Sequence, residues 1–354
     1  MHILHICSVR EIGGGERHIS DLSVALSNRG HDLYFALHRK SMLRADLGMF
    51  PKSRFCSSSR YNVFRIAAFA KANSVDVIHA HSARDYTTAA TVSRLTGIPY
   101  VLTRHVLFRM KRVNRLLLRR VAGVIAPSAA IQASLNRDGI FSREKITPIR
   151  YGIDPGRFAT ALRPAHNPFT IGSVGHLSPI KGYDTLISSA LILKDAHPDL
   201  GFRLLIVGED KAKDGCNRRE LEELTEANRL RYVVEFAGWN DDVRAALSGM
   251  DIFVSAARSE AFGLAIVEAM MAGLPVIATR SEGASEILED GVTGLLVPID
   301  QPQEMADALW RLMDDENLRS RLGKAGQGFA VSIFTRDRMA EQTESFYRNV
   351  LRTP

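Results

Sequence analysis

Residues 2–37 read HILHICSVREIGGGERHISDLSVALSNRGHDLYFAL, and this stretch decides the fold. The apolar run 2–9 predicts a buried strand, and three consecutive glycines at 13–15 predict a tight loop. Residues 16–28 have the spacing of an amphipathic helix, and 31–37 is a second apolar strand. Strand, helix and strand in this order predict a βαβ unit with parallel strands.

The same alternation continues along the chain and starts afresh in its second half. Further strands of the first half are predicted at 75–80, 100–103, 121–126 and 146–149. A second series is predicted at 169–174, 203–207, 233–236, 252–254, 275–278 and 295–297. We therefore predict an α/β fold with two Rossmann-like, doubly wound domains that face a central cleft and bind ligands at the carboxyl ends of their strands.

The length of the chain also favours two domains, because 354 residues exceed one comfortable hydrophobic core. The segment 151–168 contains three prolines and little periodicity, which predicts a linker. We place an N-terminal domain at 1–160 and a C-terminal domain at 161–335. A last helix within 336–354 is expected to pack back toward the N-terminal domain.

The composition, with 45% apolar and 24% charged residues, is that of an ordinary globular protein. No apolar run approaches the roughly 18 residues of a membrane span, and the first residues lack the basic start of a signal peptide. Three scattered cysteines are too few for a disulfide framework or a zinc site. We expect a reduced, cytoplasmic location.

The net charge of +7 is unevenly distributed. Residues 1–160 carry 25 Lys and Arg against 10 Asp and Glu, whereas residues 161–354 carry 21 against 29. Such an asymmetry concerns partners and not the fold, and it directs the first half toward something anionic. Nucleic acid and an acidic membrane surface both fit this charge.

One segment of the first half mixes basic and apolar side chains. Its seven basic residues are Arg104, Arg109, Lys111, Arg112, Arg115, Arg119 and Arg120. Arg112, Arg115 and Arg119 are expected on one face of a helix. That face suits a membrane interface with anionic headgroups, and it is also compatible with a solvated helix over an ordinary core.

The stretch Glu260-Ala-Phe-Gly-Leu-Ala-Ile-Val-Glu268 predicts a site that binds hydroxyl groups. Its first residues read as a turn, and Leu264 begins a mostly buried helix. A carboxylate accepts hydrogen bonds from sugar hydroxyls, and a helix N-terminus beside it can bind phosphate. Sugar and phosphate together indicate a nucleotide sugar. The alternative is that Glu268 lies at the polar edge of a core helix.

Other candidate residues lie in loops that follow strands. The glycines 13–15 let an anion approach backbone amides, but a plain tight turn fits as well, since Gly-x-Gly-x-x-Gly is not present. His176 and Lys181 follow the first strand of the second half, where they can meet a diphosphate or simply lie on the surface. Three histidines at strand ends fit either reading: His79, His81 and His105.

The chain contains no Asp-x-Asp, the simplest cradle for a divalent metal on a diphosphate. Cationic side chains and helix N-termini must then neutralise the phosphates. We expect no metal site and no cofactor.

Taken together, these segments resemble the retaining glycosyltransferases of family 4, also called group 1, which have the two-domain GT-B fold. The resemblance covers nearly the whole chain and depends on the order and spacing of its motifs. The matching segments are 13–17, 76–81, 103–105, 151–154, 175–182, 260–276, 283–286 and 290–298.

The resemblance implies roles for the donor-binding residues of the second half. Glu268 would hold the ribose hydroxyls, Glu260 would face the donor sugar, and Lys181 would bind the diphosphate. Three residues would present their amides to sugar or phosphate: Phe262, Gly263 and Leu264. The donor, a nucleotide-diphosphate sugar, would be bound without a metal.

In the first half, the resemblance implies that Gly14 and Gly15 approach the reacting region and that His105 lines the acceptor side. Two positions depart from the family, which usually has Arg at His176 and Asn at Tyr151. His176 is still expected at the diphosphate. Its imidazole is charged only below a pKa near 6.5, so its grip would weaken as pH rises.

The implied activity is transfer of a hexose-type sugar to a hydroxyl of a lipopolysaccharide or other cell-envelope precursor. The expected partners are the nucleotide sugar, an anionic glycolipid or saccharide acceptor and the anionic inner face of the cytoplasmic membrane, but not nucleic acid. A non-catalytic sugar-binding or scaffold subunit is the alternative, because of His176. An oxidoreductase that uses the glycine loop has little support.

Overall fold

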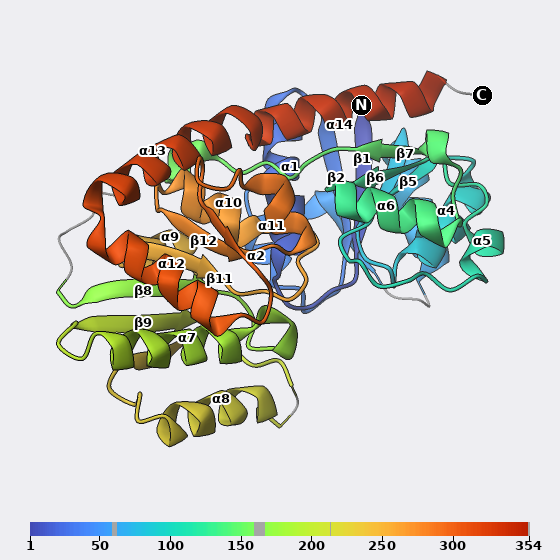
Figure 1. The fold of residues 1–354 in the computed structure, drawn as a ribbon. Coiled ribbons are helices and arrows are strands. Elements are labelled where there is room, and N and C mark those ends of the chain that lie inside the picture. The colour runs from blue at the N-terminus through green and yellow to red at the C-terminus, as the bar shows by residue number, and fades with distance from the viewer. Residues whose placement is uncertain (59–61, 159–166, 213, 353–354) are drawn as a thin grey trace. The chain divides into compact units, whose positions relative to one another are not determined.

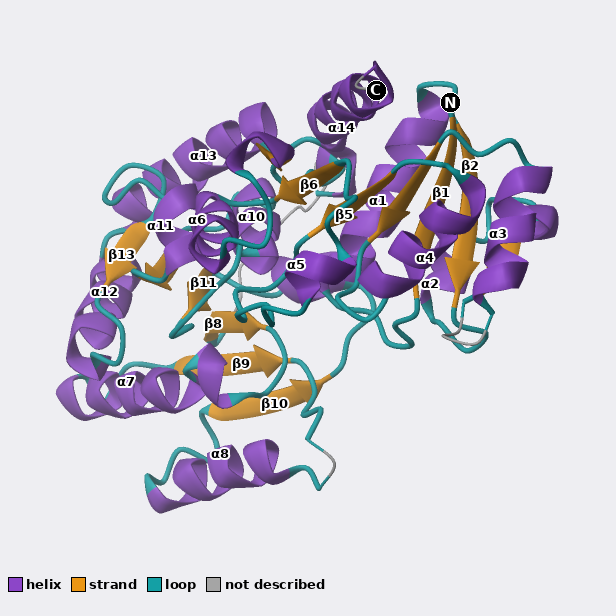
Figure 2. Cartoon of the chain, turned by 90° about the vertical axis from the view of Figure 1, so that its right-hand side faces the viewer, coloured by secondary structure: helices purple, strands orange, loops and turns teal. Residues whose placement is uncertain are grey.

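The computed structural model describes residues 1–58, 62–158, 167–212 and 214–352. They form two compact units, one made of Met1–Asp154 with Phe334–Pro354 and the other of Pro155–Ile333. Each unit is built around a parallel sheet, whose strands are orange in Figure 2. The boundary predicted at 160/161 falls in 159–166, outside the described residues. The boundary predicted at 335/336 lies two residues beyond the observed division.

The first unit contains a seven-stranded sheet in the order β3-β2-β1-β4-β5-β6-β7. All of its pairings are parallel. The strands are β1 His2–Cys7, β2 Asp32–Leu37, β3 Phe55–Ser57, β4 Val77–Ala80, β5 Tyr100–Thr103, β6 Gly123–Ala126 and β7 Ile146–Pro148. The predicted βαβ unit and the later strands are therefore confirmed. β3 was not predicted, because three residues are too short for a period to show.

Helices surround this sheet, as Figure 1 shows. They are α1 Gly14–Asn28, α2 Leu43–Asp46, α3 Val63–Ala72, α4 Tyr86–Thr96, α5 Asn114–Leu117, α6 Ala129–Asp138 and α14 Arg336–Arg352. The prediction of a helix with Arg112, Arg115 and Arg119 on one face is wrong, because only the four residues of α5 are helical in this segment. The segment that precedes α5 is instead anchored by a hydrogen bond, in which the Met110 amide donates to the Asp138 carboxylate at 2.9 Å.

The second unit contains a six-stranded sheet in the order β10-β9-β8-β11-β12-β13. Its strands are β8 Phe169–Val174, β9 Phe202–Val207, β10 Val234–Gly238, β11 Ile252–Ser255, β12 Val276–Thr279 and β13 Leu295–Val297. Its helices are α7 Tyr183–Ala196, α8 Cys216–Ala227, α9 Val243–Ser248, α10 Leu264–Met271, α11 Glu282–Ile287, α12 Pro302–Asp314 and α13 Glu316–Ile333. All six strands lie within two residues of their predicted bounds. None of the helices within the described ranges is long and apolar enough to cross a membrane.

The last helix, α14, belongs to the first unit and packs on α1. Four of its side chains enter the core that β1, β2 and α1 share: Met339, Ala340, Phe346 and Tyr347. Phe346 lies so close to Gly123 of β6 that a Cβ at this glycine would overlap its ring. The glycine therefore lets the helix lie flat against the sheet.

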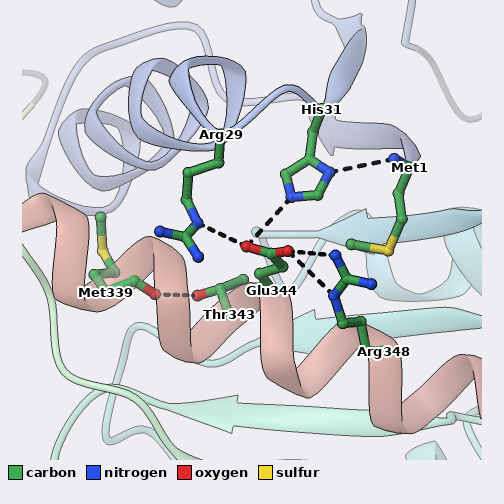
Figure 3. A network of polar contacts seen from close by, with 7 residues as sticks. All are labelled: Met1, Arg29, His31, Met339, Thr343, Glu344 and Arg348. Carbon is green, nitrogen blue, oxygen red and sulfur yellow. Dashed lines mark hydrogen bonds and ion pairs between the residues drawn. The ribbon is translucent and has the colours of Figure 1, made fainter.

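A polar network at Glu344 also ties α14 to the start of the chain (Figure 3). The Glu344 carboxylate accepts hydrogen bonds from Arg29 at 2.6 Å and from Arg348 at 2.6 and 3.1 Å. His31 lies 3.7 Å from the same carboxylate and contacts the amino group of Met1 at 3.2 Å. These donors, Arg348 first, lower the pKa of Glu344 to about 2.

We predict that Glu344→Gln lowers the free energy of unfolding by about 1–2 kcal/mol, because hydrogen bonds to a charged group are lost. The pKa is lowered in the folded state, so this stabilisation is present above pH 4.5 and is lost as pH falls toward 2. Urea unfolding at pH 7 measures it, with the exposed Glu341→Gln on the same helix as control. Equal stability of the two variants would contradict the prediction.

Candidate active site

The second unit has a topological switch point at β8, whose neighbours β9 and β11 continue the sheet in opposite directions. Loops that leave the carboxyl ends of such strands border a natural ligand crevice. Lys181 ends a 3-10 turn after β8, and Glu260 lies in the loop after β11. Their Nζ and Oε2 atoms are 2.6 Å apart, and the side chains are only 28% and 18% exposed. Two residues chosen from the sequence thus meet at this edge.

A close backbone contact holds these two loops in place. Gly182 has φ +63°, and a Cβ there would overlap the carbonyl oxygen of Ala256 just after β11. Arg258 adds ion pairs with Asp184 at 2.6 Å and Asp300 at 2.7 Å, and it donates to the carbonyl of Pro179. The turn that carries Lys181 is therefore fixed on the strand that leads to Glu260.

The loop after β11 leads directly into the N-terminus of α10. Gly263 has φ +103°, a conformation that favours glycine, and it precedes the first residue of the helix. Gly283 donates from its amide to the Glu260 carbonyl at 2.8 Å, and a Cβ at Gly283 would overlap the Phe262 carbonyl. The first turn of α10, beginning at Leu264, has amides without intrahelical acceptors. Phosphate favours such a helix end.

Glu268 lies on α10, one turn after Leu264, and is 5% exposed. Its burial is compatible both with a ribose-binding role and with the alternative that it lies at the polar edge of a core helix. Residues four apart share a face of a helix, so Glu268 lies on the face that Leu264 begins. The carboxylate and the free amides belong to the same short helix.

His176 follows β8 but has a different neighbour from Lys181. Its ring is nearly parallel to that of Trp239, with centroids 6.0 Å apart and an angle of 11°. Trp239 follows β10, and the Lys211 ammonium lies over its ring, with Nζ 5.7 Å from the ring centroid. Sequence reasoning missed Trp239 and Lys211, although each lies within four residues of the end of a predicted strand.

In the first unit, the glycine loop and His105 come together. A Cβ at Gly15 would lie 3.3 Å from the His105 ring, so Gly14 and Gly15 bring the start of α1 close to this imidazole. His105 Nδ1 is hydrogen-bonded to the Tyr151 hydroxyl. His18, which the sequence reading missed, lies on α1 between them, with ring centroids 5.4 Å from His105 and 4.5 Å from Tyr151.

Three more buried histidines lie behind this pair, and His5 among them was not predicted. His5 Nδ1 is 2.9 Å from His81 Nε2. His79 contacts the Tyr347 hydroxyl of α14 at 2.6 Å and Thr103 at 2.7 Å. One nitrogen from each of these three rings lies within 4.8 Å of the other two, close enough to consider a metal. Both nitrogens of His79 are already hydrogen-bonded, so the arrangement suits a hydrogen-bond network better.

Burial keeps the five histidines neutral. It lowers the pKa of His5 and of His105 to about 3. It lowers the pKa of the other three well below 6.5, with a smaller contribution from neighbouring rings: His18, His79 and His81. His105 can therefore exchange hydrogen bonds with a ligand but brings no positive charge to it.

Two Rossmann-like units of this kind are the architecture of the GT-B fold, and comparison with known proteins shows the class to be the glycosyltransferases. A profile of "Glycosyltransferase Family 4" matches residues 12–157, and one of "Glycosyl transferases group 1" matches residues 158–329. The crystal structure of Anabaena Alr3699/HepE in complex with UDP and glucose superimposes with a TM-score of 0.85 at 23% identity, covering 97% of this chain and 98% of that one.

Among relatives, the chain is 30% identical over 298 residues to D-inositol 3-phosphate glycosyltransferase of Arthrobacter sp. (strain FB24), which covers 72% of this chain and 67% of that protein. It is 33% identical over 178 residues to the lipopolysaccharide core biosynthesis glycosyltransferase LpsE of Rhizobium meliloti (strain 1021), and this match spans 50% of the chain and about half, 49%, of LpsE. The chain belongs to the group 1 glycosyltransferases of family 4.

We predict that acid destabilises the first unit through its neutral histidines. Their folded pKa values lie below 6.5, so they stabilise the fold above that pH, and stability is lost as pH falls toward 3. Each proton taken up only on unfolding contributes about 1.4 kcal/mol per pH unit. The variant His18→Phe keeps the aromatic packing. Between pH 6 and pH 5 its free energy of unfolding should fall by about 1 kcal/mol less than that of the wild type.

Urea unfolding at the two pH values measures this difference. His197→Phe in the second unit, outside the histidine cluster, is the control and should behave as the wild type. An unchanged acid sensitivity of His18→Phe would show that its imidazole is not held neutral.

Proposed function

We propose that the protein transfers a hexose-type sugar from a nucleotide-diphosphate sugar to an acceptor hydroxyl, with retention of anomeric configuration. The observation that carries the proposal is the contact between Lys181 and Glu260 at the switch point of the second unit. It combines a cation for phosphate with a carboxylate for hydroxyls. Solved structures of similar fold are described with UDP and with UDP-glucose, which supports a nucleotide-sugar donor.

In the proposed donor complex, the diphosphate draws the Lys181 ammonium away from Glu260. The freed carboxylate of Glu260 then accepts hydrogen bonds from the hexose, while Glu268 accepts those of the ribose. Amides at Phe262, Gly263 and Leu264 take up phosphate or sugar oxygens, and His176 contributes to the diphosphate. These donors neutralise the phosphates without a metal, so activity should survive EDTA.

The proposed reaction exchanges one bond for another on the same face of the hexose. The bond from the anomeric carbon to the diphosphate oxygen breaks, and a bond to the acceptor oxygen forms. The acceptor proton passes to the leaving diphosphate. Gly14, Gly15 and the neutral His105 position the acceptor, so catalysis consists mainly of placement and charge stabilisation.

We predict that Glu268→Gln weakens binding of a nucleotide sugar at least tenfold, because charge-assisted hydrogen bonds to the ribose are worth about 1.5–3 kcal/mol. Isothermal calorimetry with UDP-, GDP- and ADP-glucose measures it, and Glu304→Gln on the exposed face of α12 is the matched control. If none of the three donors binds the wild type, the proposed function is wrong. A scaffold subunit would bind the donor but neither hydrolyse nor transfer its sugar.

We further propose that the acceptor is a lipopolysaccharide or other cell-envelope precursor, reached at an anionic membrane surface. The support is the segment 106–120, together with the similarity to LpsE, a lipopolysaccharide core biosynthesis glycosyltransferase. Five apolar side chains of this segment are 38–75% exposed: Val106, Phe108, Val113, Leu116 and Leu117. They alternate along the chain with exposed basic residues, so this segment exposes both apolar and cationic groups. Anionic bilayers attract such surfaces.

We predict that replacing Arg109, Arg112 and Arg115 by Gln lowers the affinity for vesicles of anionic phospholipid about 100-fold, since each cation near the surface contributes about 1 kcal/mol. Cosedimentation at low salt measures it. The control replaces the exposed residues Arg231, Arg311 and Lys324 of the second unit and makes the same change in charge. Equal losses in both variants would show a nonspecific charge effect and discredit this membrane surface.

A further inference from the structure

A polar cavity of about 640 Å³ lies at the carboxyl edge of the first unit's sheet. Its lining comes from the segments that follow β1, β2, β3 and β4, and it therefore includes the switch point between β1 and β4. The residues that matter here are Ser8, Arg10, His38, Arg84, Asp85 and Thr88. The size and the position are those of a small-ligand site.

Two guanidinium groups border this cavity. Arg10 follows β1 and Arg84 follows β4, and both side chains are exposed. Among the described residues, neither has an ion-pair partner, although Glu11 and Asp85 also line the cavity. An exposed guanidinium that forms no ion pair is available to a planar or tetrahedral anion. The N-terminus of α4 begins beside them and favours the same sign of ligand.

The deeper part of the cavity suits hydroxyl groups. Asp85 is 2% exposed, and its carboxylate accepts a hydrogen bond from the Ser8 amide at 2.8 Å. One lone pair of Oδ2 is used in this bond, so further acceptor capacity is left. Ser58 and Thr88, also buried, add hydroxyls to the wall. The Asp85 carboxylate would repel an anion close to it. An anionic group of a ligand is therefore expected beside Arg10 and Arg84, and ligand hydroxyls are expected deeper, beside Asp85.

We propose that this cavity binds the acceptor as a saccharide that carries an anionic substituent, a phosphate or a carboxylate, with the substituent at Arg10 and Arg84 and the ring hydroxyls at Asp85. The inference rests on the proposed function, because it assigns the sugar that receives the hexose. It narrows the acceptor class from any hydroxyl compound to an anionic sugar. His38, which follows β2, lies on the same wall and can donate to the substituent.

The test uses the full chain and four probes: glucose 6-phosphate, glucuronate, glucose and inorganic phosphate. Ligand-observed NMR titration to 10 mM should show binding of glucose 6-phosphate or glucuronate at least tenfold tighter than glucose and inorganic phosphate. The variant R10Q/R84Q should lose that binding at least tenfold. The variant R65Q/R94Q removes two exposed arginines of the same unit outside the cavity and should bind as the wild type does.

The phosphate and carboxylate arms distinguish the two substituents. No binding of either anionic sugar, or unchanged binding in R10Q/R84Q, overturns the proposal. UDP binding, measured on the same samples, depends on the second unit and should be unaffected by either variant. If UDP-sugars bind but anionic sugars do not, the cavity assignment fails alone. If anionic sugars bind but no nucleotide sugar does, the donor proposal fails and the cavity stands.

Discussion

The contact of Gly182 with the carbonyl of Ala256 is the constraint on which the second unit's site depends. It presses the turn after β8 onto the end of β11, and only a residue without a side chain fits there. Because these strands flank the switch point, the contact places Lys181 beside Glu260 at the carboxyl edge. The positive φ of Gly263 then turns the chain into α10, which has an N-terminus of the kind that favours phosphate and carries the buried Glu268. The positions of Lys181 and of the N-terminus of α10 therefore depend on the backbone conformations of Gly182 and Gly263.

The two units handle charge in opposite ways. The second brings Lys181 and Glu260 together at the carboxyl edge of its sheet. The first places four buried histidines and the half-buried His105 near its glycine loop, where desolvation lowers their pKa values and leaves them neutral. A neutral imidazole such as His105 can orient a hydroxyl without attracting the leaving diphosphate. Positive charge in the first unit lies instead at its surface, in the segment 106–120 and at the rim of the polar cavity.

Much of the fold could be predicted, because buried parallel strands show as apolar runs and the helix of Pro302–Asp314 shows its 3.6-residue period. Local sequence could not predict the histidine network, since His79 meets Tyr347 across 268 positions of chain. The helix expected around Arg112 failed because alternating apolar and basic residues fit a helix as well as an irregular segment anchored by Asp138. Strand ends located the loops of Lys181 and Glu260, whereas only the structure paired their side chains. Trp239 was overlooked because local sequence does not distinguish a loop tryptophan that borders the candidate site from one elsewhere on the surface.

The most direct test of the account is a crystal structure of the protein grown with a nucleoside diphosphate that calorimetry shows to bind. We expect electron density for the diphosphate within hydrogen-bonding distance of Lys181 and the first turn of α10. The pentose hydroxyls should lie on the Glu268 carboxylate. An ordered nucleotide elsewhere, with Lys181 still paired to Glu260, would contradict the account.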